Sequence, residues 1–309
     1  MTGAHVGVDV GGTKVLGVVT DDAGAILHEA RRPTPKGGPA ILDTVAAVAG
    51  DLGAGRPGAT LGVGIAGLVE RRGVLLAAPN LAVDEALNVR GGLRDRLHVD
   101  VAVDNDATCA ALAEWRAGAA AGFDDVVLVT LGTGIGGGLV LGGVVQHGAH
   151  GFTGEYGHMV VDPAGPPCPC GRRGCWERYA SGAGLAWLAR RAAAEGRLDA
   201  PGGIDDLRGE DVRASALAGD VGALAVVDEF ARWVAIGLVN LTNLVDPAIL
   251  VLGGGLAADP GLYEPPIARW FAALLYSSEI RPAPKLAFAT LGEHAGAIGA
   301  ALLGAAAAR

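Results

Sequence analysis

The sequence predicts an α/β protein with two duplicated lobes. Strand-like segments 6–10 and 15–20 are joined by the glycine turn Gly11-Gly12-Thr13. A second pair, 126–131 and 139–145, is joined in the same way by the glycine-rich run 132–138. A strand–turn–strand pattern that occurs twice in one chain indicates an internal duplication. The length of 309 residues suits one large or two modest domains.

The first lobe continues with alternating strands and helices. Residues 25–31 predict a third strand that completes a β-meander. A helix is expected at 41–49, a buried strand at 61–65, a further strand at 99–103 and an alanine-rich helix at 107–120. We expect residues 1–117 to form a small N-terminal lobe.

The second lobe is expected to span residues 118–294. Helices are predicted at 182–195, 212–218 and 222–244, and a buried strand at 249–252. Residues 195–210 are polar and glycine-rich, which is typical of a surface loop. The apolar segment 295–309 is too short to span a bilayer, and we expect it to be a helix that packs back on the first lobe.

Charge and composition narrow the classes of partner. Lys and Arg number 24 and Asp and Glu number 33, so the net charge is −9. A chain this acidic is a poor ligand for nucleic acids or anionic membranes. The N-terminus lacks the basic region and continuous apolar stretch of a signal peptide, and we expect a cytoplasmic protein.

Three glycine clusters follow predicted strands. They are Gly11-Gly12-Thr13-Lys14, the run Gly132-Thr133-Gly134 with its continuation to Gly138, and Gly253-Gly254-Gly255. Backbone N–H groups of glycine approach phosphates closely, so the clusters predict nucleotide binding, although any one alone is typical of a tight hairpin. Neither a P-loop nor a dinucleotide fingerprint is predicted, because the expected segment after each of the first two turns is a strand.

Two aspartates stand where predicted strands end. Asp9 precedes the first glycine turn and could order Mg²⁺ beside phosphates or fix the turn. Asp106 lies in Asp104-Asn105-Asp106, between a strand and a helix. It could be a general base for an attacking hydroxyl or the helix N-cap, and the spacing alone leaves both roles open.

A metal site is predicted at His158, Cys168, Cys170 and Cys175. Three thiolates and one imidazole form the closed tetrahedral set of structural zinc. Glu155 and Glu177 flank this loop, so a bound metal would tie both carboxylates to one frame that suits a polyol ligand. Since the first two glycine turns lie outside residues 158–175, metal loss is expected to weaken polyol binding much more than nucleotide binding.

Six motifs together resemble the ROK family of sugar kinases and related repressors. They are DVGGTK (9–14), DNDA (104–107), TLGTGIGGG (130–138), GEYGH (154–158), CPCGRRGCWE (168–177) and LGGG (252–255). The resemblance covers nearly the whole chain, and the chain looks most like the bacterial ATP-dependent glucokinases of the family. This chain departs from the family pattern at Thr108 and Cys109, and again where AVDEALNV follows the PNL segment. These departures affect the prediction of which sugar is bound.

The resemblance implies an actin-like ATPase (ribonuclease H-like) fold with a cleft between two lobes. It implies that Asp106 is the catalytic base and that ATP, Mg²⁺ and structural Zn²⁺ are the cofactors. The sugar ligands it implies are Gly67, Asn80, Asn105, Asp106, Glu155, His158 and Glu177. The nucleotide ligands are Asp9, Gly11, Gly12, Thr13, Lys14, Gly132, Thr133, Gly134, Gly254 and Gly255.

The expected activity is transfer of the γ-phosphoryl group of ATP to the 6-hydroxyl of a hexose, glucose first. Fructose, mannose or an N-acetylhexosamine such as N-acetylmannosamine remain alternatives, as does polyphosphate as donor. A sugar-responsive regulator is a further alternative, but we expect no DNA-binding module before Asp9. The resemblance also implies a homodimer or homotetramer.

Overall fold

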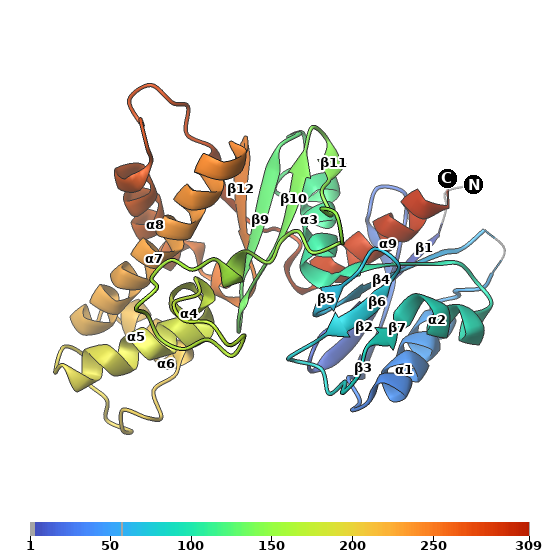
Figure 1. Cartoon of the computed structure of the whole chain (residues 1–309), viewed down its shortest axis with the longest axis horizontal. Coiled ribbons are helices and arrows are strands. Elements are labelled where there is room, and N and C mark those ends of the chain that lie inside the picture. The colour runs from blue at the N-terminus through green and yellow to red at the C-terminus, as the bar shows by residue number, and fades with distance from the viewer. Residues whose placement is uncertain (1–3, 57, 309) are drawn as a thin grey trace. The chain divides into compact units, whose positions relative to one another are not determined.

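The computed structural model describes residues 4–56 and 58–308, and it divides into two compact units. The first unit comprises Met1–Leu128, Gly138–Gly154 and Thr290–Arg309, and the second comprises Val129–Gly137 and Glu155–Ala289. Residues 1–3 of the predicted first lobe and residue 309 of the predicted C-terminal helix lie outside the described part (Figure 1).

The sheet of the first unit has the strand order β3-β2-β1-β4-β8. Its strands are β1 (His5–Val10), β2 (Lys14–Thr20), β3 (Ile26–Pro33), β4 (Thr60–Ile65) and β8 (Val101–Asn105). β1, β2 and β3 pair antiparallel as the predicted meander, whereas β4 pairs parallel with β1 and with β8. The carboxyl ends of β1, β4 and β8 therefore meet at one edge.

Helices cover both faces of this sheet, as the alternation along β2 requires. Val15 and Val19 pack with α1 (Gly38–Asp51) and α2 (Val89–Leu97) in one core. Leu16 and Val18 pack with α3 (Asp106–Ala117) and α9 (Ala295–Ala307) in another. The small sheet β5 (Leu68–Val69), β6 (Val74–Ala77) and β7 (Leu87–Asn88) completes the strands of the first unit before β8.

The C-terminal helix α9 lies directly against β1 and β4 (Figure 1). Gly7 and Gly62 are register partners on these strands. A Cβ on Gly7 would lie 2.0 Å from the Ala297 carbonyl oxygen, and one on Gly62 would lie 1.8 Å from that of Ala300. The two glycines thus allow helix and sheet backbones to touch, which is why an alanine-rich segment suffices there.

The second five-stranded sheet has the order β11-β10-β9-β12-β13. Its strands are β9 (Val126–Leu131), β10 (Ile135–Leu141), β11 (Val144–Val145), β12 (Ile249–Gly253) and β13 (Lys285–Phe288). Counted along the chain, this is third-second-first-fourth-fifth, the same order as in the first sheet. The predicted duplication is therefore confirmed by topology.

One strand prediction in the second repeat was wrong. Residues 139–145 were expected to form a single strand, but β10 begins earlier, at Ile135, and ends at Leu141, where a turn leads to β11. Gly142 and Gly143 have φ values of 57° and 71°, and Leu141 pairs with Val144. Two adjacent left-handed glycines form a tight hairpin turn, so the chain reverses instead of continuing.

The helices of the second unit are α4 (Glu177–Ala180), α5 (Gly182–Ala194), α6 (Gly209–Leu217), α7 (Val221–Val245) and α8 (Pro260–Leu274). α8 was not predicted, because Pro265 and Pro266 lie inside it. α7 packs against each of the other four helices. Within residues 4–56 and 58–308, none of the helices combines the length and apolarity that a membrane span needs.

Candidate functional site

Asp106 is the first residue of α3 and follows β8 directly. The N-cap is instead Asn105, whose Oδ1 accepts the N–H groups of Ala107 and Thr108 at 2.9 and 3.1 Å. Asn105 Nδ2 donates to the Gly67 carbonyl at 3.0 Å, which brings these two predicted sugar ligands together. The capping role that the sequence left open for Asp106 is thus filled by its neighbour.

The carboxyl group of Asp106 lies in a poorly solvated position. Burial raises its pKa above the usual 3.8, while N–H groups at the start of α3 and the Asn105 side chain act in the opposite direction. A carboxylate with a raised pKa is a better proton acceptor, provided that it remains ionised at the working pH. The location and the pKa shift are those of a candidate general base.

Asp9 and Asp104 lie at the same level of the first sheet, because both pair in register with Gly64. The pKa of Asp9 is raised to about 7, chiefly by burial and also by the nearby charge of Asp106, while Lys14 acts in the opposite direction. Asp9 Oδ1 is buried with no hydrogen-bond partner among the described residues. An unpaired buried carboxylate oxygen beside a second acid fits the Mg²⁺ role predicted for Asp9.

The first glycine turn is closed by backbone and hydroxyl hydrogen bonds. The Gly11 N–H donates to the Lys14 carbonyl at 3.0 Å, and the Thr34 hydroxyl donates to the Gly11 carbonyl at 2.6 Å. A Cβ on Gly12 would lie 2.8 Å from the Asn80 carbonyl oxygen, so only glycine allows this approach. Gly11, Gly12, Thr13 and Asn80 therefore form one continuous group.

Lys14, also assigned to the nucleotide, is engaged elsewhere in this structure. Its amine is ion-paired with Glu293, which also accepts from the Arg31 guanidinium at 2.8 Å. The two cations lower the pKa of Glu293 to about 2, Lys14 having the larger effect. Lys14 would have to leave Glu293 to reach a phosphate.

The second glycine turn is also closed by a backbone hydrogen bond, which spans one residue fewer than that of the first turn. The Gly132 N–H donates to the Gly134 carbonyl at 3.0 Å, and exposed Thr133 is at the tip. Gly254 has a φ of 83°, and its Cβ would lie 2.6 Å from the Leu131 carbonyl oxygen. The Gly253–Gly255 turn therefore lies beside the end of β9. Because a strand follows Gly134, the dinucleotide fold is excluded here, as expected.

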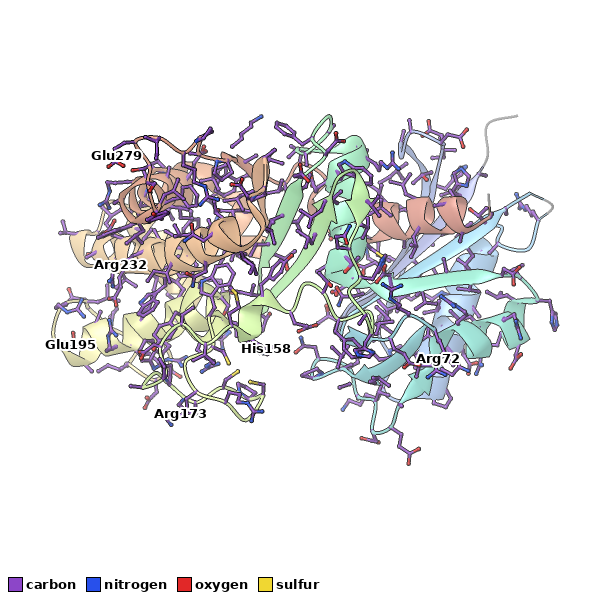
Figure 2. The ribbon with its side chains drawn as sticks, turned by 45° about the horizontal axis from the view of Figure 1, so that its top comes forward. Arg72, His158, Arg173, Glu195, Arg232 and Glu279 are labelled. Carbon is purple, nitrogen blue, oxygen red and sulfur yellow. The ribbon has the colours of Figure 1, made fainter. Side chains whose placement is uncertain are left out.

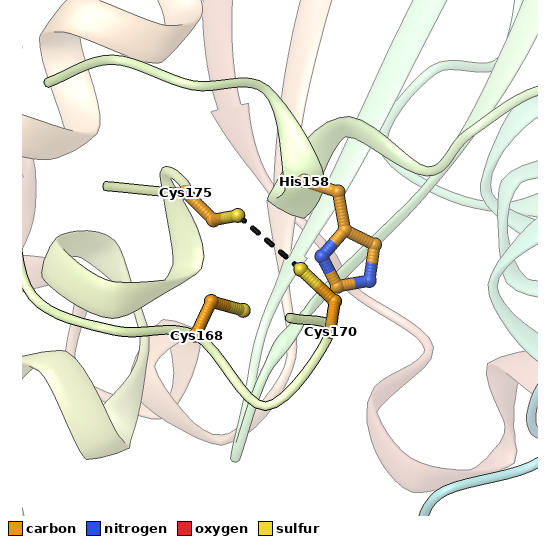
Figure 3. A group of neighbouring side chains, drawn as sticks. All are labelled: His158, Cys168, Cys170 and Cys175. Atoms are coloured by element: carbon orange, nitrogen blue, oxygen red, sulfur yellow. Dashed lines mark hydrogen bonds between the residues drawn. The ribbon is translucent and has the colours of Figure 1, made fainter. Parts of the chain in front are cut away.

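The predicted metal ligands come together in space. One donor atom from each of His158, Cys168, Cys170 and Cys175 lies within 4.8 Å of the others, and the sulfurs of Cys170 and Cys175 are 3.6 Å apart (Figure 3). Tetrahedral zinc with bonds of about 2.3 Å to sulfur implies a sulfur–sulfur separation of about 3.8 Å. The four residues therefore fit a zinc ion.

His158 lies between the two glutamates assigned to the sugar. Its Nε2 is 3.8 Å from Glu155 Oε2 and its Nδ1 is 3.8 Å from Glu177 Oε1. One ring nitrogen faces the cysteines and the other points away from them (Figure 3). His158 also lies on the exposed side of its unit (Figure 2), with 43% of its side chain accessible. The imidazole can therefore bind a metal on one side and a hydroxyl on the other.

The metal loop is not independent of the second glycine turn, contrary to expectation. A Cβ on Gly134 would lie 2.9 Å from Glu177 Oε2, and the Gly182 N–H donates to the Gly132 carbonyl at 2.8 Å. Glu177 Oε1 is also 3.2 Å from the Cys168 sulfur. Glu177 thus connects the cysteine cluster to the predicted phosphate turn, a contact that sequence distance conceals.

A buried tryptophan holds this loop to the long helix. Trp176 lies between Cys175 and Glu177, is fully buried, and donates its indole N–H to the Trp233 carbonyl at 2.7 Å. A Cβ on Gly237 of α7 would lie 1.9 Å from the Trp176 ring. The ring therefore rests on the bare backbone of α7, which fixes the start of α4 and Glu177 with it.

Sequence reasoning missed two buried charged groups. Asp104 pairs with His147, and Glu114 of α3 accepts the N–H groups of Thr290 and Leu291 at 2.9 and 2.8 Å. Their partners are 43 and about 176 residues away in the chain. A single sequence carries no signal for such pairs beyond the position of Asp104 in the DNDA motif.

Comparisons with known proteins agree with this arrangement. Residues 5–307 match the ROK family. The chain belongs to the ROK family. Its sequence is 36% identical, over 97% of this chain and 96% of the relative, to a protein named glucokinase from Streptomyces coelicolor. It is 34% identical, over 97% of this chain and 98% of the relative, to an N-acetyl-D-glucosamine kinase from Shigella boydii.

Solved ROK structures include one very similar in fold. A ROK family glucokinase from Streptomyces griseus, described in complex with glucose and AMPPNP, superposes with a TM-score of 0.86. It shares 37% identity, and the match covers 98% of this chain and 100% of that one. Together with the two sheets of identical strand order, this match confirms the predicted actin-like ATPase fold with two lobes.

Proposed function

We propose that this ROK protein is an ATP-dependent hexose kinase that makes glucose 6-phosphate. The observation that carries the proposal is Asp106, a carboxylate at the end of β8 whose capping role has been taken over by Asn105. A poorly solvated acid at such a position, with the helix capped by its neighbour, is suited to proton transfer. Similarity to glucokinases supports the choice of reaction.

In the proposed reaction Asp106 accepts the proton of the sugar 6-hydroxyl. The hydroxyl oxygen forms a bond to the γ-phosphorus, and the bond from that phosphorus to the oxygen of ADP breaks. The other hydroxyls are assigned to residues that the resemblance to the ROK family implies, namely Gly67, Asn80, Asn105, Glu155, His158 and Glu177. Their chemistry, carboxylates with an amide and an imidazole, suits a polyol.

The nucleotide is assigned to the glycine turns. N–H groups at Gly11–Thr13 and Gly132–Gly134 donate to phosphate oxygens, and Gly254 and Gly255 lie near the adenosine. Mg²⁺, when bound, neutralises charge on the phosphate oxygens. Asp9 would hold it, while Lys14 reaches the phosphates after leaving Glu293.

Structural zinc completes the proposal. A bound zinc ion would fix the loop through bonds to His158, Cys168, Cys170 and Cys175. Homodimer or homotetramer formation stays a prediction, which light scattering of the purified protein would test.

The identity of the hexose is the finer part of the proposal. Glucose is the leading substrate, and the 34% identity to an N-acetyl-D-glucosamine kinase makes N-acetylhexosamines the main competitors. A coupled assay should compare glucose, fructose, mannose, N-acetylglucosamine and N-acetylmannosamine, each with ATP and with polyphosphate. We expect the highest kcat/KM for glucose with ATP. A higher value for another sugar would change the substrate, and no turnover of any hexose would refute the kinase.

A further inference from the structure

Asp104 is a buried carboxylate directly before the Asn105–Asp106 pair. Only 7% of the residue is accessible. Its Oδ1 accepts the N–H of Asn105 at 2.8 Å, and its Oδ2 lies 2.7 Å from His147 Nε2, which donates to it. A buried carboxylate is costly unless it is paired and hydrogen-bonded. His147 is its cationic partner, and Asp104 in turn orients the backbone of Asn105.

Residues 148–151, which follow His147 in the first unit, pack against β5 and the residues after it. The Arg71 N–H donates to the His150 carbonyl at 3.2 Å, and the Arg71 Nε–H donates to the Gly148 carbonyl at 2.9 Å. A Cβ on Gly151 would lie 2.8 Å from the Val69 carbonyl oxygen. The segment therefore lies closely against β5 and the residues after it. The backbone that follows His147 is therefore held by contacts other than the one with Asp104.

The surrounding charges explain why a cation is needed there. Asp9 on β1, Asp104 on β8 and Asp106 on α3 all raise the pKa of the buried Cys109 thiol, after burial itself. Lys14 acts on Asp9 from β2. His147 faces Asp104, whose hydrogen bond raises the imidazole pKa above 6.5, while burial and Arg71 lower it. Lys14 and His147 thus each offset one carboxylate of the group.

We propose that His147 is a positioning residue that acts through Asp104 to fix Asn105, the N-cap of the helix that begins with Asp106. This inference rests on the proposed function, because it assigns His147 to the hexose kinase reaction. The Nε2–H bond holds Asp104 so that Asn105 can cap α3 and donate to Gly67.

The two parts of this role respond differently to substitution. Gln can place an amide N–H near the position of the imidazole Nε2–H but carries no charge, whereas Ala removes both. The positive charge of His147 is present below its raised pKa and is lost as the pH rises through it. Without that charge the hydrogen bond to Asp104 is no longer charge-assisted, so kcat should fall in part as the pH rises through the imidazole pKa.

The test compares His147→Ala, His147→Gln and the control His150→Gln on the same segment. Loss of a charge-assisted hydrogen bond predicts a fall in kcat of roughly 10- to 100-fold for His147→Ala. We expect His147→Gln to recover most of kcat but to lack the fall of kcat with rising pH, and His150→Gln to match the parent in both. A parent-like kcat in His147→Ala, or a parent-like pH profile in His147→Gln, would overturn the proposal.

NMR titration of the His147 ring gives a readout that needs no activity and serves if His147→Ala does not fold. The imidazole should titrate above its usual pKa in the parent and lower in Asp104→Asn. An unchanged titration in Asp104→Asn would refute the pairing. If the parent phosphorylates no hexose, the proposed function fails, while this titration still reports whether His147 and Asp104 are coupled.

Discussion

The candidate site acids of the first unit lie on regular structure, whereas those of the second lie on short turns around the cysteines. Asp9 is the last residue but one of β1, and Asp104 and Asp106 lie at the junction of β8 and α3. Glu155 precedes a three-residue 3₁₀ helix, and Glu177 begins a four-residue helix. The second pair is also more accessible, with 43% and 18% of the side chains exposed against 9% for Asp104.

This difference shows two ways to hold a carboxylate in place. In the first unit a hydrogen-bonded sheet and a capped helix fix the acids, and burial raises the pKa of two of them. Only short helices adjoin Glu155 and Glu177 in the second unit, so the cysteine cluster and Trp176 supply the rigidity there. The first arrangement should resist metal removal, and the second should depend on it.

The largest effect is expected when the Asp106 carboxylate of the first unit is removed. Asp106→Asn should lower kcat by about 10²- to 10⁴-fold, because the general base is lost while the helix keeps its Asn105 cap. Glucose affinity by calorimetry should change little. Asp100→Asn, an exposed acid before the same strand, is the control. A parent-like kcat in Asp106→Asn would mean that the base lies elsewhere.

A second substitution tests the burial of the Asp9 carboxylate in the first unit. The folded pKa of Asp9 is about 7 against a usual 3.8, so the folded state holds more protons between those pH values. The free energy of unfolding must therefore fall as the pH rises through this range, by at most about 4 kcal/mol. Asp9→Asn should remove the fall and be more stable than the parent at pH 8 without ligand.

Thermal unfolding from pH 4 to 8 measures this effect. Asp84→Asn, at an exposed position of the same unit, should retain the pH dependence of the parent. Equal pH dependence in Asp9→Asn and the parent would show that Asp9 is ionised and solvated, against the comparison drawn above.

The third substitution disrupts the cysteine cluster of the second unit. Cys170→Ala should lose the metal and weaken glucose binding roughly 10- to 100-fold, as the frame of His158 and Glu177 relaxes. Affinity for a non-hydrolysable ATP analogue should also fall, though less, since Glu177 and Gly182 contact the Gly132–Gly134 turn. Elemental analysis and separate titrations measure the three quantities.

Cys109→Ala is the matched control for the cysteine cluster. This thiol belongs to the first unit, so the variant should retain its metal. If Cys170→Ala loses the metal and still binds glucose as the parent does, the metal is not needed to hold Glu155 and Glu177 in place.

The smallest effect is expected from a substitution that tests the contact between Glu177 and the second glycine turn. In Gly134→Ala the new methyl group would push the Glu177 carboxylate away, and we expect KM for glucose to rise a few-fold with kcat nearly unchanged. Gly261→Ala, where a Cβ meets nothing within 4 Å, should leave KM as in the parent. An unchanged KM in Gly134→Ala would mean that Glu177 does not bind the sugar.

Most of the strands and the grouping of the histidine with the three cysteines could be predicted, because both leave local signals. Short apolar runs beside glycine turns mark β1, β2 and β9, and the spacing of Cys168, Cys170 and Cys175 is typical of a metal site. Tertiary contacts leave no such local signal in the sequence. Nothing near His147 in the sequence points to Asp104, and nothing near Gly134 points to Glu177. The choice of Asn105 as the cap over Asp106 needed backbone geometry, since either residue type caps well.

The most direct test of the account is the product formed by the parent protein from glucose, ATP and Mg²⁺. Phosphorus NMR of the reaction should show glucose 6-phosphate and ADP appearing together in equal amounts. The same mixture with Asp106→Asn should show almost none over the same time. Phosphate attached at another hydroxyl, or ATP consumed without a phosphorylated sugar, would contradict the assignment of Asp106 to the 6-hydroxyl of a hexose.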